Sequence, residues 1–151
     1  MAAIDIQPLA EQEIREYGFT HKGKITAAQL AANYVDNTAK AIFSVAPGDL
    51  VGQFAFRLLT AFDGTASTSL LLTAGDGGDP DRYLVSTELH NDATEVVWFH
   101  NVAATAPYLY LVADTVDLIF DIVTAAMTDI NVGELHLFWR FVSLRKLDTG
   151  V

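Results

Sequence analysis

The chain contains 151 residues, which is enough for one domain with a substantial hydrophobic core. Its nineteen acidic and nine basic residues give a formal net charge of −10, so the chain should repel nucleic-acid phosphates, and we expect no nucleic-acid partner. It has no cysteine, which excludes disulfide scaffolds, thiol nucleophiles and thiolate metal sites.

The charge is distributed unevenly along the chain. Between Leu58 and Trp139 there are twelve acidic residues and one basic residue, Arg82, whereas the two flanking segments together carry eight basic and seven acidic residues. The middle of the chain should therefore present a solvated acidic surface, and the ends are freer to dock on a partner. A need for solubility alone would also explain the acidic middle.

The N-terminal part of the chain carries little strand pattern. It lacks the basic and apolar regions of a signal peptide, and the apolar runs of the chain are too short to span a membrane, so we expect no membrane association. Helix formers occur over residues 10–17 and 26–34, but the second run has weak caps. Pro8 interrupts any helix near the N-terminus, and we expect residues 1–35 to form an extended arm or lead-in segment before a domain over residues 36–151.

Apolar and polar residues alternate with a period of two through most of this domain, as they do in β-strands. The clearest run is residues 115–123, whose polar face carries Asp117 and Asp121. The apolar face of the same run consists of Val116, Leu118, Phe120 and Ile122. This pattern predicts a half-buried antiparallel strand. Comparable runs occupy residues 39–45, 49–62, 67–74, 95–102 and 133–144.

The last run, residues 133–144, has apolar residues on both of its faces. The face that should join the core consists of Leu135, Leu137, Trp139 and Phe141. The second face consists of Glu134, His136, Phe138, Arg140 and Val142. Because apolar side chains on an exposed strand face favour aggregation, this face should be covered by a neighbour, and we expect self-association.

Turn residues separate the predicted strands. The turn signals are Pro47-Gly48-Asp49, Asp63-Gly64, Asn91-Asp92 and Asn131-Val132-Gly133. About eight short strands joined by such turns predict an all-β fold, namely an antiparallel β-sandwich of the jelly-roll type. Helices should be short where they occur at all.

The segment "GDGGDPDR" at residues 75–82 gathers glycines, aspartates and a proline at the end of a strand. A phosphate-binding loop is excluded, because no lysine follows the glycines and the carboxylates would repel phosphate. Clustered carboxylates suit calcium, but the spacing of Asp76, Asp79 and Asp81 does not match an EF-hand. We favour a tight turn, in which glycines adopt positive φ and aspartates accept hydrogen bonds from the local backbone.

The sequence offers no catalytic constellation. Its histidines are not spaced as a transition-metal motif, and its serines do not lie in a nucleophile motif. The four histidines are His21, His90, His100 and His136. Trp98, Trp139 and several phenylalanines could stack on sugars, although such rings more often belong to a core or a subunit interface. We expect neither an enzyme nor a bound cofactor or metal.

Residues 40–145 resemble small virion proteins of tailed bacteriophages, namely capsid decoration (cement) proteins and related head-fibre proteins. Four elements carry the resemblance: a strand that enters "FDG", a second that ends in "GDGGDPDR", a late "ADTVD" strand, and a closing "GEL" strand rich in aromatic residues. The N-terminal 35 residues lie outside the resemblance. It is a pattern of strands and turns and contains no catalytic signature.

The resemblance implies a structural virion protein that binds the outer surface of the phage head at capsomer junctions. Its expected partners are the major capsid protein and two further copies of itself, in a homotrimer. The candidate capsid or subunit contacts are Ile4, Ile6, Leu9 and Arg15 in the arm and Phe138, Arg140 and Val142 on the last strand. The alternative is a head-fibre, neck or tail module that recognises a host surface glycan, which exposure of Trp98, Tyr108 or Tyr110 would favour.

Overall fold

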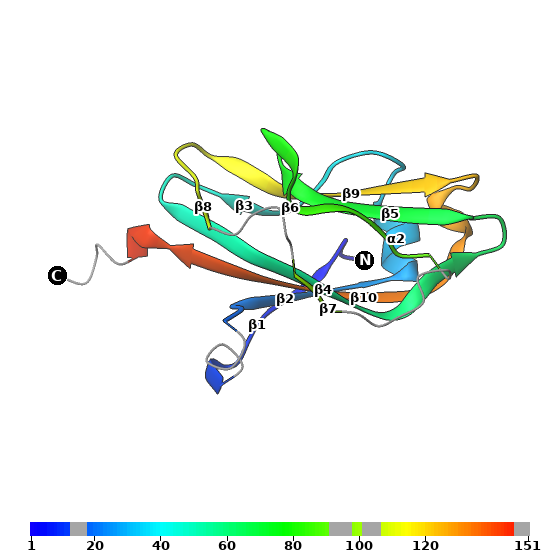
Figure 1. Ribbon diagram of the computed structural model, residues 1–151, viewed down its shortest axis with the longest axis horizontal. Coiled ribbons are helices and arrows are strands. Elements are labelled where there is room, and N and C mark those ends of the chain that lie inside the picture. Colours follow the sequence, from blue (N-terminus) through cyan, green and yellow to red (C-terminus); the bar gives the residue numbers. More distant parts are fainter. Residues whose placement is uncertain (13–17, 91–97, 101–106, 147–151) are drawn as a thin grey trace.

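Two antiparallel β-sheets face each other in a computed structural model of the chain (Figure 1), which confirms the predicted all-β sandwich. The structure describes all residues except 13–17, 91–97, 101–106 and 147–151. Among the described residues, no helix is long and apolar enough to cross a membrane.

The larger sheet, sheet A, contains the first and the last of the described strands. Its strand order is β1 (Asp5–Pro8), β2 (His21–Thr26), β10 (Ile130–Ser143), β4 (Asp49–Gly64) and β7 (Trp98–His100), and β8 (Tyr108–Leu109) also pairs with β4. The smaller sheet, sheet B, has the order β3 (Lys40–Val45), β9 (Asp114–Val123), β5 (Ser69–Asp76) and β6 (Asp79–Glu88). The predicted strand at residues 95–102 is described only at β7.

The core fills the space between the sheets, and the alternation in β9 and β10 defines its two walls. The four apolar residues predicted to face inward on β9 are all buried, as are Leu135, Leu137 and Trp139 of β10. Trp139 lies between its neighbours on sheet A, because its ring stacks on His21 of β2 and on Phe54 of β4. Phe43 of sheet B also stacks on Trp139, with ring centroids 5.4 Å apart, so this indole joins the two layers.

A short helix, α2 (Ala27–Asn33), closes one end of the sandwich between the sheets (Figure 1). The expectation of weak caps was wrong. Thr26 and Gln29 form a capping box, in which the Thr26 side chain accepts from the Gln29 backbone N–H and the Gln29 side chain accepts from the Thr26 backbone N–H. Leu30 on this helix is fully buried.

The predicted boundary after residue 35 does not divide the structure. β2 lies inside sheet A, where it pairs with β10 from Thr26–Glu134 to His21–Trp139, and Ile25 is in the core. The N-terminus is also tied down, because Ile4 is only 8% exposed and the Ala2 carbonyl accepts from Gln29 of α2. Of the expected arm, β1 remains on the edge of sheet A with exposed side chains. Most of the expected helix at residues 10–17 lies outside the described residues.

The turn signals had mixed outcomes. Pro47 and Gly48 form the turn between β3 and β4, and Gly48 has a φ of +91°, which glycine adopts without strain. Asn131, Val132 and Gly133, in contrast, lie within β10, and the chain reverses earlier, at the short helical turn η1 (Met127–Asp129). Two of the four register shifts between β10 and β4, those between Ile130 and Val132 and between Val132 and Glu134, accommodate these residues without taking them out of the sheet.

Candidate functional site

The outer face of sheet A gathers basic side chains. Because Leu135, Leu137 and Trp139 point into the core, alternation directs His136, Phe138 and Arg140 outward. The register places Lys24 and Arg57 beside His136, and Lys22 beside Phe138, so these residues share that face. We call Lys22, Lys24, Arg57 and Arg140 together with Phe138 the cationic face.

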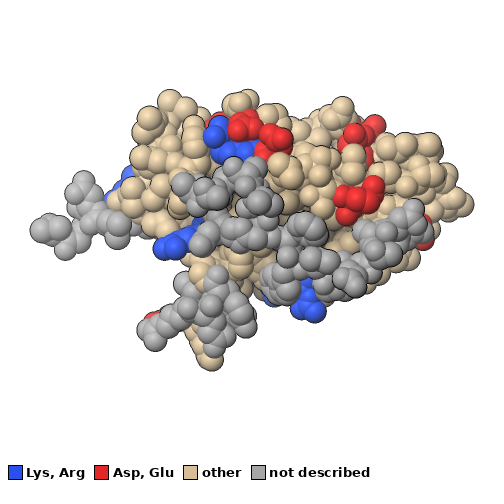
Figure 2. All heavy atoms as spheres, viewed as in Figure 1, with Lys and Arg blue, Asp and Glu red and all other residues tan. Residues whose placement is uncertain are grey.

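This arrangement separates charge on an acidic chain. In the view of Figure 2, acidic groups lie mainly along the layer of sheet B, and basic groups lie mainly along the layer of sheet A. Two of the acidic residues on the outer side of sheet B are Asp117 and Asp121 on β9. In this view the two layers therefore carry mainly opposite charges.

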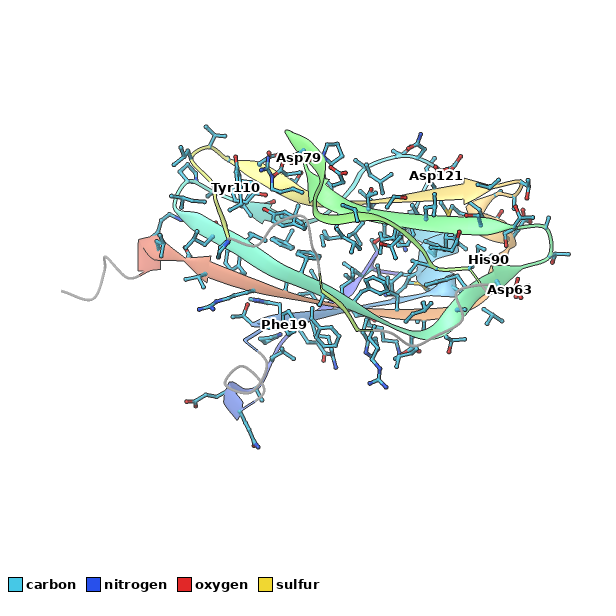
Figure 3. All side chains as sticks on the ribbon, in the orientation of Figure 1. Phe19, Asp63, Asp79, His90, Tyr110 and Asp121 are labelled. Atoms are coloured by element: carbon cyan, nitrogen blue, oxygen red, sulfur yellow. The ribbon has the colours of Figure 1, made fainter. Side chains whose placement is uncertain are left out.

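The centre of the cationic face is apolar. Phe19 lies on the side of sheet A that points away from sheet B (Figure 3), and its ring centroid is 5.8 Å from that of Phe138. Ala55, which is opposite Phe138 in the register, is buried. Phe138 and Val142 are half-buried and Arg140 is exposed, so the second face of β10 combines apolar and positive groups as the sequence predicted.

A polar groove of about 660 Å³ lies between β1 and the adjoining part of the cationic face. It is lined by Ile4, Asp5, Ile6, Gln7, Lys22, Lys24, Glu134 and His136. Glu134 organises it, because its Oε1 is 3.0 Å from His136 Nε2 and 3.4 Å from Lys24 Nζ. Burial lowers the pKa of His136, and the positive charges of Lys22 and Lys24 lower it further against the opposing effect of Glu134.

The aspartate segment forms the turn between β5 and β6. Asp76 is 4% exposed, and its Oδ1 accepts from the backbone N–H groups of Gly78 and Asp79. Its Oδ2 accepts from Arg82 Nε at 2.6 Å and from the Tyr110 hydroxyl at 2.9 Å. Both carboxylate oxygens are therefore used by protein donors, and no group of three or more potential metal ligands occurs among the described residues.

The glycines of this turn act differently from the prediction. Gly77 and Gly78 do not have positive φ, in contrast to Gly18, Gly48 and Gly133. The constrained glycine is Gly75, because a Cβ there would collide with the Asp79 carbonyl oxygen and with the backbone of Pro80. The close approach of β6 to β5 therefore requires a glycine one residue before Asp76.

Asp76 also anchors a distant segment of the chain through tyrosines. The Tyr110 hydroxyl that binds Asp76 is 2.6 Å from the Tyr83 hydroxyl, and the Arg82 guanidinium lies 3.8 Å from the centroid of the Tyr108 ring. Burial disfavours ionisation of Asp76, but the hydrogen bonds from Arg82 and Tyr110 and the charge of Arg82 outweigh it and hold the pKa below its usual range. We call Asp76, Arg82, Tyr83 and Tyr110 the Asp76 network.

The segment held by this network exposes apolar side chains at one end of the sandwich. Leu109 is 40% exposed, Leu111 is 76% exposed and Val112 is 68% exposed. We call these three residues the apolar tip. Its backbone is fixed beside the β3–β4 turn, since Gly48 N–H donates to the Tyr110 carbonyl and Tyr110 N–H donates to the Asp49 carbonyl.

A serine–histidine–aspartate cluster occurs among the described residues, but it lacks the geometry of a catalytic triad. Ser67 Oγ is 3.1 Å from His90 Nε2, and Asp63 Oδ1 is 3.5 Å from the same nitrogen. In a triad the carboxylate must hold the other imidazole nitrogen, so that the first nitrogen can take the serine proton. Here Nδ1 of His90 is buried with no hydrogen-bond partner in the described part of the chain. His90 and Asp63 lie toward the end opposite Tyr110 (Figure 3).

The structure distributes the predicted contact residues among different environments. Ile4 packs on Gly23 in the core and is unavailable as a surface anchor. Ile6 is 38% exposed, lines the groove and also borders a pocket of about 220 Å³ between the sheets, whereas Leu9 is half-buried. Arg15 lies outside the described residues. Tyr110 is buried and cannot stack on a sugar, Tyr108 is partly exposed, and the side chain of Trp98 is outside the description.

Sequence reasoning missed two features of the surface. The cationic face had a signal in "HKGKIT", where two lysines alternate around a glycine, but only the pairing with β10 places them beside Arg57. The apolar tip had a signal in the run "YLYLV" at residues 108–112, yet this pattern resembles an ordinary buried strand. No protein-family model, curated protein or solved structure matched the chain in comparisons with known proteins.

Proposed function

We propose that this chain is a structural virion protein, a capsid decoration protein that binds the outer surface of a phage head at capsomer junctions and stabilises the shell. The structural observation that supports the proposal is the cationic face, which is a broad, partly apolar surface on a chain of net charge −10. The resemblance of residues 40–145 to small virion proteins supplies the location.

The chemistry of the cationic face suits coverage by a macromolecule. Its positive groups are spread over three neighbouring strands, β2, β10 and β4, and surround the half-buried ring of Phe138. Mainly positive charges around an apolar centre, with Glu134 paired to Lys24 at one edge, complement an acidic protein surface and orient it as it approaches. Its proposed partners are further copies of the chain, in a homotrimer, and the major capsid protein.

The edge of sheet A at β1 is the element that we assign to contact with the shell. Among the described residues, β1 pairs only with β2, and its side chains are exposed. Ile6 on this strand and Leu9 just after it provide apolar surface next to the groove. This assignment keeps Ile6 and Leu9 from the contacts expected from the sequence. It leaves out Ile4, whose side chain is buried in the core.

Imaging of virus particles tests the proposal. Particles purified from cells that carry this gene should show the sandwich over capsomer junctions, and particles that lack the chain should break at lower temperature. Ile6→Asn should reduce occupancy on the particles, whereas Val85→Asn, an equally polar change at an exposed position on β6, should not. A chain that remains in the soluble cell fraction, with no density on any particle, would contradict the proposed function.

A second candidate function is glycan recognition by a head-fibre, neck or tail module, and the polar groove is the observation that favours it. Carboxylate, amide, ammonium and imidazole groups line this groove, and such groups hydrogen-bond sugar hydroxyls. Titration of host surface oligosaccharides into the protein tests this function, with Gln7→Ala compared with Asn131→Ala at an exposed position on β10. Saturable binding that only Gln7→Ala weakens would establish the second function.

A further inference from the structure

We propose that copies of this chain associate end to face, with the apolar tip of one copy docked on the cationic face of the next. The inference rests on the proposed function in one respect, which is that the cationic face binds a macromolecule. It names that macromolecule as a second copy of the same chain and identifies the surface that the second copy contributes.

The apolar tip is already ordered before it meets a partner. β8 pairs with β4 through Leu109–Leu50 and Tyr108–Val51, which fixes the segment on its N-terminal side. The Tyr110 hydroxyl is bonded to the buried Asp76 carboxylate, which fixes the residue between Leu109 and Leu111. Because these contacts hold the backbone, docking of the tip loses little conformational entropy. A fixed segment that exposes Leu111 and Val112 to water is an apolar surface of the kind that a binding partner covers.

Carboxylates border the apolar tip on its sheet B side. Asp114 begins β9 directly after the tip, and its Oδ1 is within 3.2 Å of where a Cβ on Gly77 would lie, so the β5–β6 turn adjoins the base of the tip. Asp79 and Asp81 follow this turn; Asp79 is half-buried and Asp81 is exposed. In Figure 3, Asp79 and Tyr110 lie toward the same end of the sandwich. The tip is therefore an apolar projection with carboxylates along its sheet B side, where Arg82 pairs with Asp76 and Asp79, and with Arg145 at the adjoining β3–β4 turn.

The cationic face has the complementary composition. Phe138 provides an apolar centre, and Lys22 and Arg140 lie around it on β2 and β10. An acidic border on one surface and a basic border on the other favour a single docking orientation and disfavour face-to-face or tip-to-tip contacts between copies. Each copy therefore carries both surfaces of a charge-matched interface, and the apolar tip of one copy meets the cationic face of another.

The positions of the two surfaces determine the kind of assembly. The tip lies at one end of the sandwich, whereas the cationic face lies along its side (Figures 1 and 3), so each copy must be turned relative to the one before. A contact between two different surfaces is heterologous, and it produces a closed ring when successive rotations add up to a full turn. The measured mass of the assembly reports the number of copies in that ring.

A charge-reversal cycle tests the pairing by light scattering and analytical ultracentrifugation at micromolar concentration. Asp79→Lys/Asp81→Lys reverses the border of the tip, and Lys22→Glu/Arg140→Glu reverses the border of the face. Each pair should raise the dissociation constant about tenfold or more, because like charges then meet across the contact. The variant that combines all four substitutions should recover the association of the original chain, because both borders are reversed together.

Net charge cannot account for these outcomes. The tip variant changes the net charge from −10 to −6, because each of two replacements adds two charges, and a smaller net charge by itself would favour association. Asp117→Lys/Asp121→Lys makes the same change on the outer side of sheet B and should leave association intact. Circular dichroism confirms that every variant is folded.

Three results would overturn the inference: a monomeric wild-type chain, association that tolerates either reversed pair, or no recovery in the combined variant. Attachment to virus particles is measured separately. A chain that decorates particles as a monomer would refute the end-to-face contact and leave the proposed attachment to the phage head standing. A ring that binds no particle would support the end-to-face contact and refute that attachment.

Discussion

The Asp76 carboxylate and the Arg82 guanidinium, 2.6 Å apart at Oδ2 and Nε, face each other across the turn that joins β5 to β6. The Asp76 side chain is almost fully buried, and the Arg82 side chain is 20% exposed. This pair, together with Tyr110, joins a local turn to a segment that follows it by more than twenty-five residues in the chain. The segment predicted to be a tight turn thus also supports the apolar tip.

Replacement of Asp76 by asparagine should destabilise the fold. The change removes the charge that balances Arg82, and breaking a buried ion pair from one side costs about 3 kcal/mol of unfolding free energy. Urea denaturation measures this loss. Asp79→Asn is the matched control, because Asp79 is partly exposed and its carboxylate is 3.9 Å from Arg82, and it should change the unfolding free energy by less than about 0.5 kcal/mol. Equal losses in the two variants would contradict the role of Asp76.

The contribution of Asp76 should disappear in acid. Its pKa in the folded chain is below the ordinary value of 3.8, so the unfolded chain takes up the proton first as the pH falls. The stabilisation is therefore complete above about pH 5 and is lost as the pH falls through 3.8 toward the folded-state value. Denaturation curves of the wild type and of Asp76→Asn should converge over this range, and a constant difference down to the lowest pH would disprove the prediction.

Gly75 should be the intolerant glycine of the turn. Alanine at this position drives its Cβ into the backbone of Asp79 and Pro80, which should cost at least about 2 kcal/mol. Gly78→Ala should be tolerated, because Gly78 does not have positive φ and its added Cβ would come no closer than 3.5 Å to a neighbouring atom. Thermal unfolding of the two variants provides the comparison, and a larger loss for Gly78→Ala would show that the close approach at Gly75 is misassigned.

The N-terminal segment should contribute to stability through Ile4. Its side chain is buried against Gly23 and near Trp139, so Ile4→Ala should cost about 2–4 kcal/mol of unfolding free energy. Ile6→Ala removes the same atoms from a side chain that is already 38% exposed, and it should cost less than about 1 kcal/mol. If a chain without its first four residues unfolded at the same denaturant concentration as the intact chain, the segment would be a detachable arm after all.

Two histidines should make the fold less stable in mild acid. Burial lowers the pKa of His21, and burial together with Lys22 and Lys24 lowers that of His136. The unfolded chain therefore binds protons first, and stability should fall as the pH drops below the ordinary histidine pKa of 6.5. Denaturation at about pH 7.5 and about pH 5.5 should show this loss, and His136→Gln should reduce it. A pH response that His136→Gln leaves unchanged would assign the effect to other groups.

The sequence alone determined those parts of the structure in which the residue pattern of a single strand distinguishes its core face from its other face. In β9 and β10 the alternation identifies the core-facing side chains, of which Phe141 is only partly buried, because a period of two follows from the backbone geometry of an extended chain. The Pro47-Gly48 turn was predictable for a similar reason, since Gly48 adopts a positive φ that glycine allows without strain. These are local properties, and neighbouring residues in the chain decide them.

The tertiary structure alone decided the roles of β2, Asp76 and the apolar tip. β2 carries two lysines and a glycine, and it becomes a central strand because β10 offers it a full set of backbone partners from His21–Trp139 to Thr26–Glu134. Asp76 resembles a turn residue or a metal ligand until Arg82 and Tyr110 occupy its oxygens. Leu111 lies in an apolar run, yet it is 76% exposed because residues 110–113 connect β8 to β9 outside both sheets. Contacts between residues that are far apart in the chain determine these three outcomes, and no local pattern records which partner a side chain will meet.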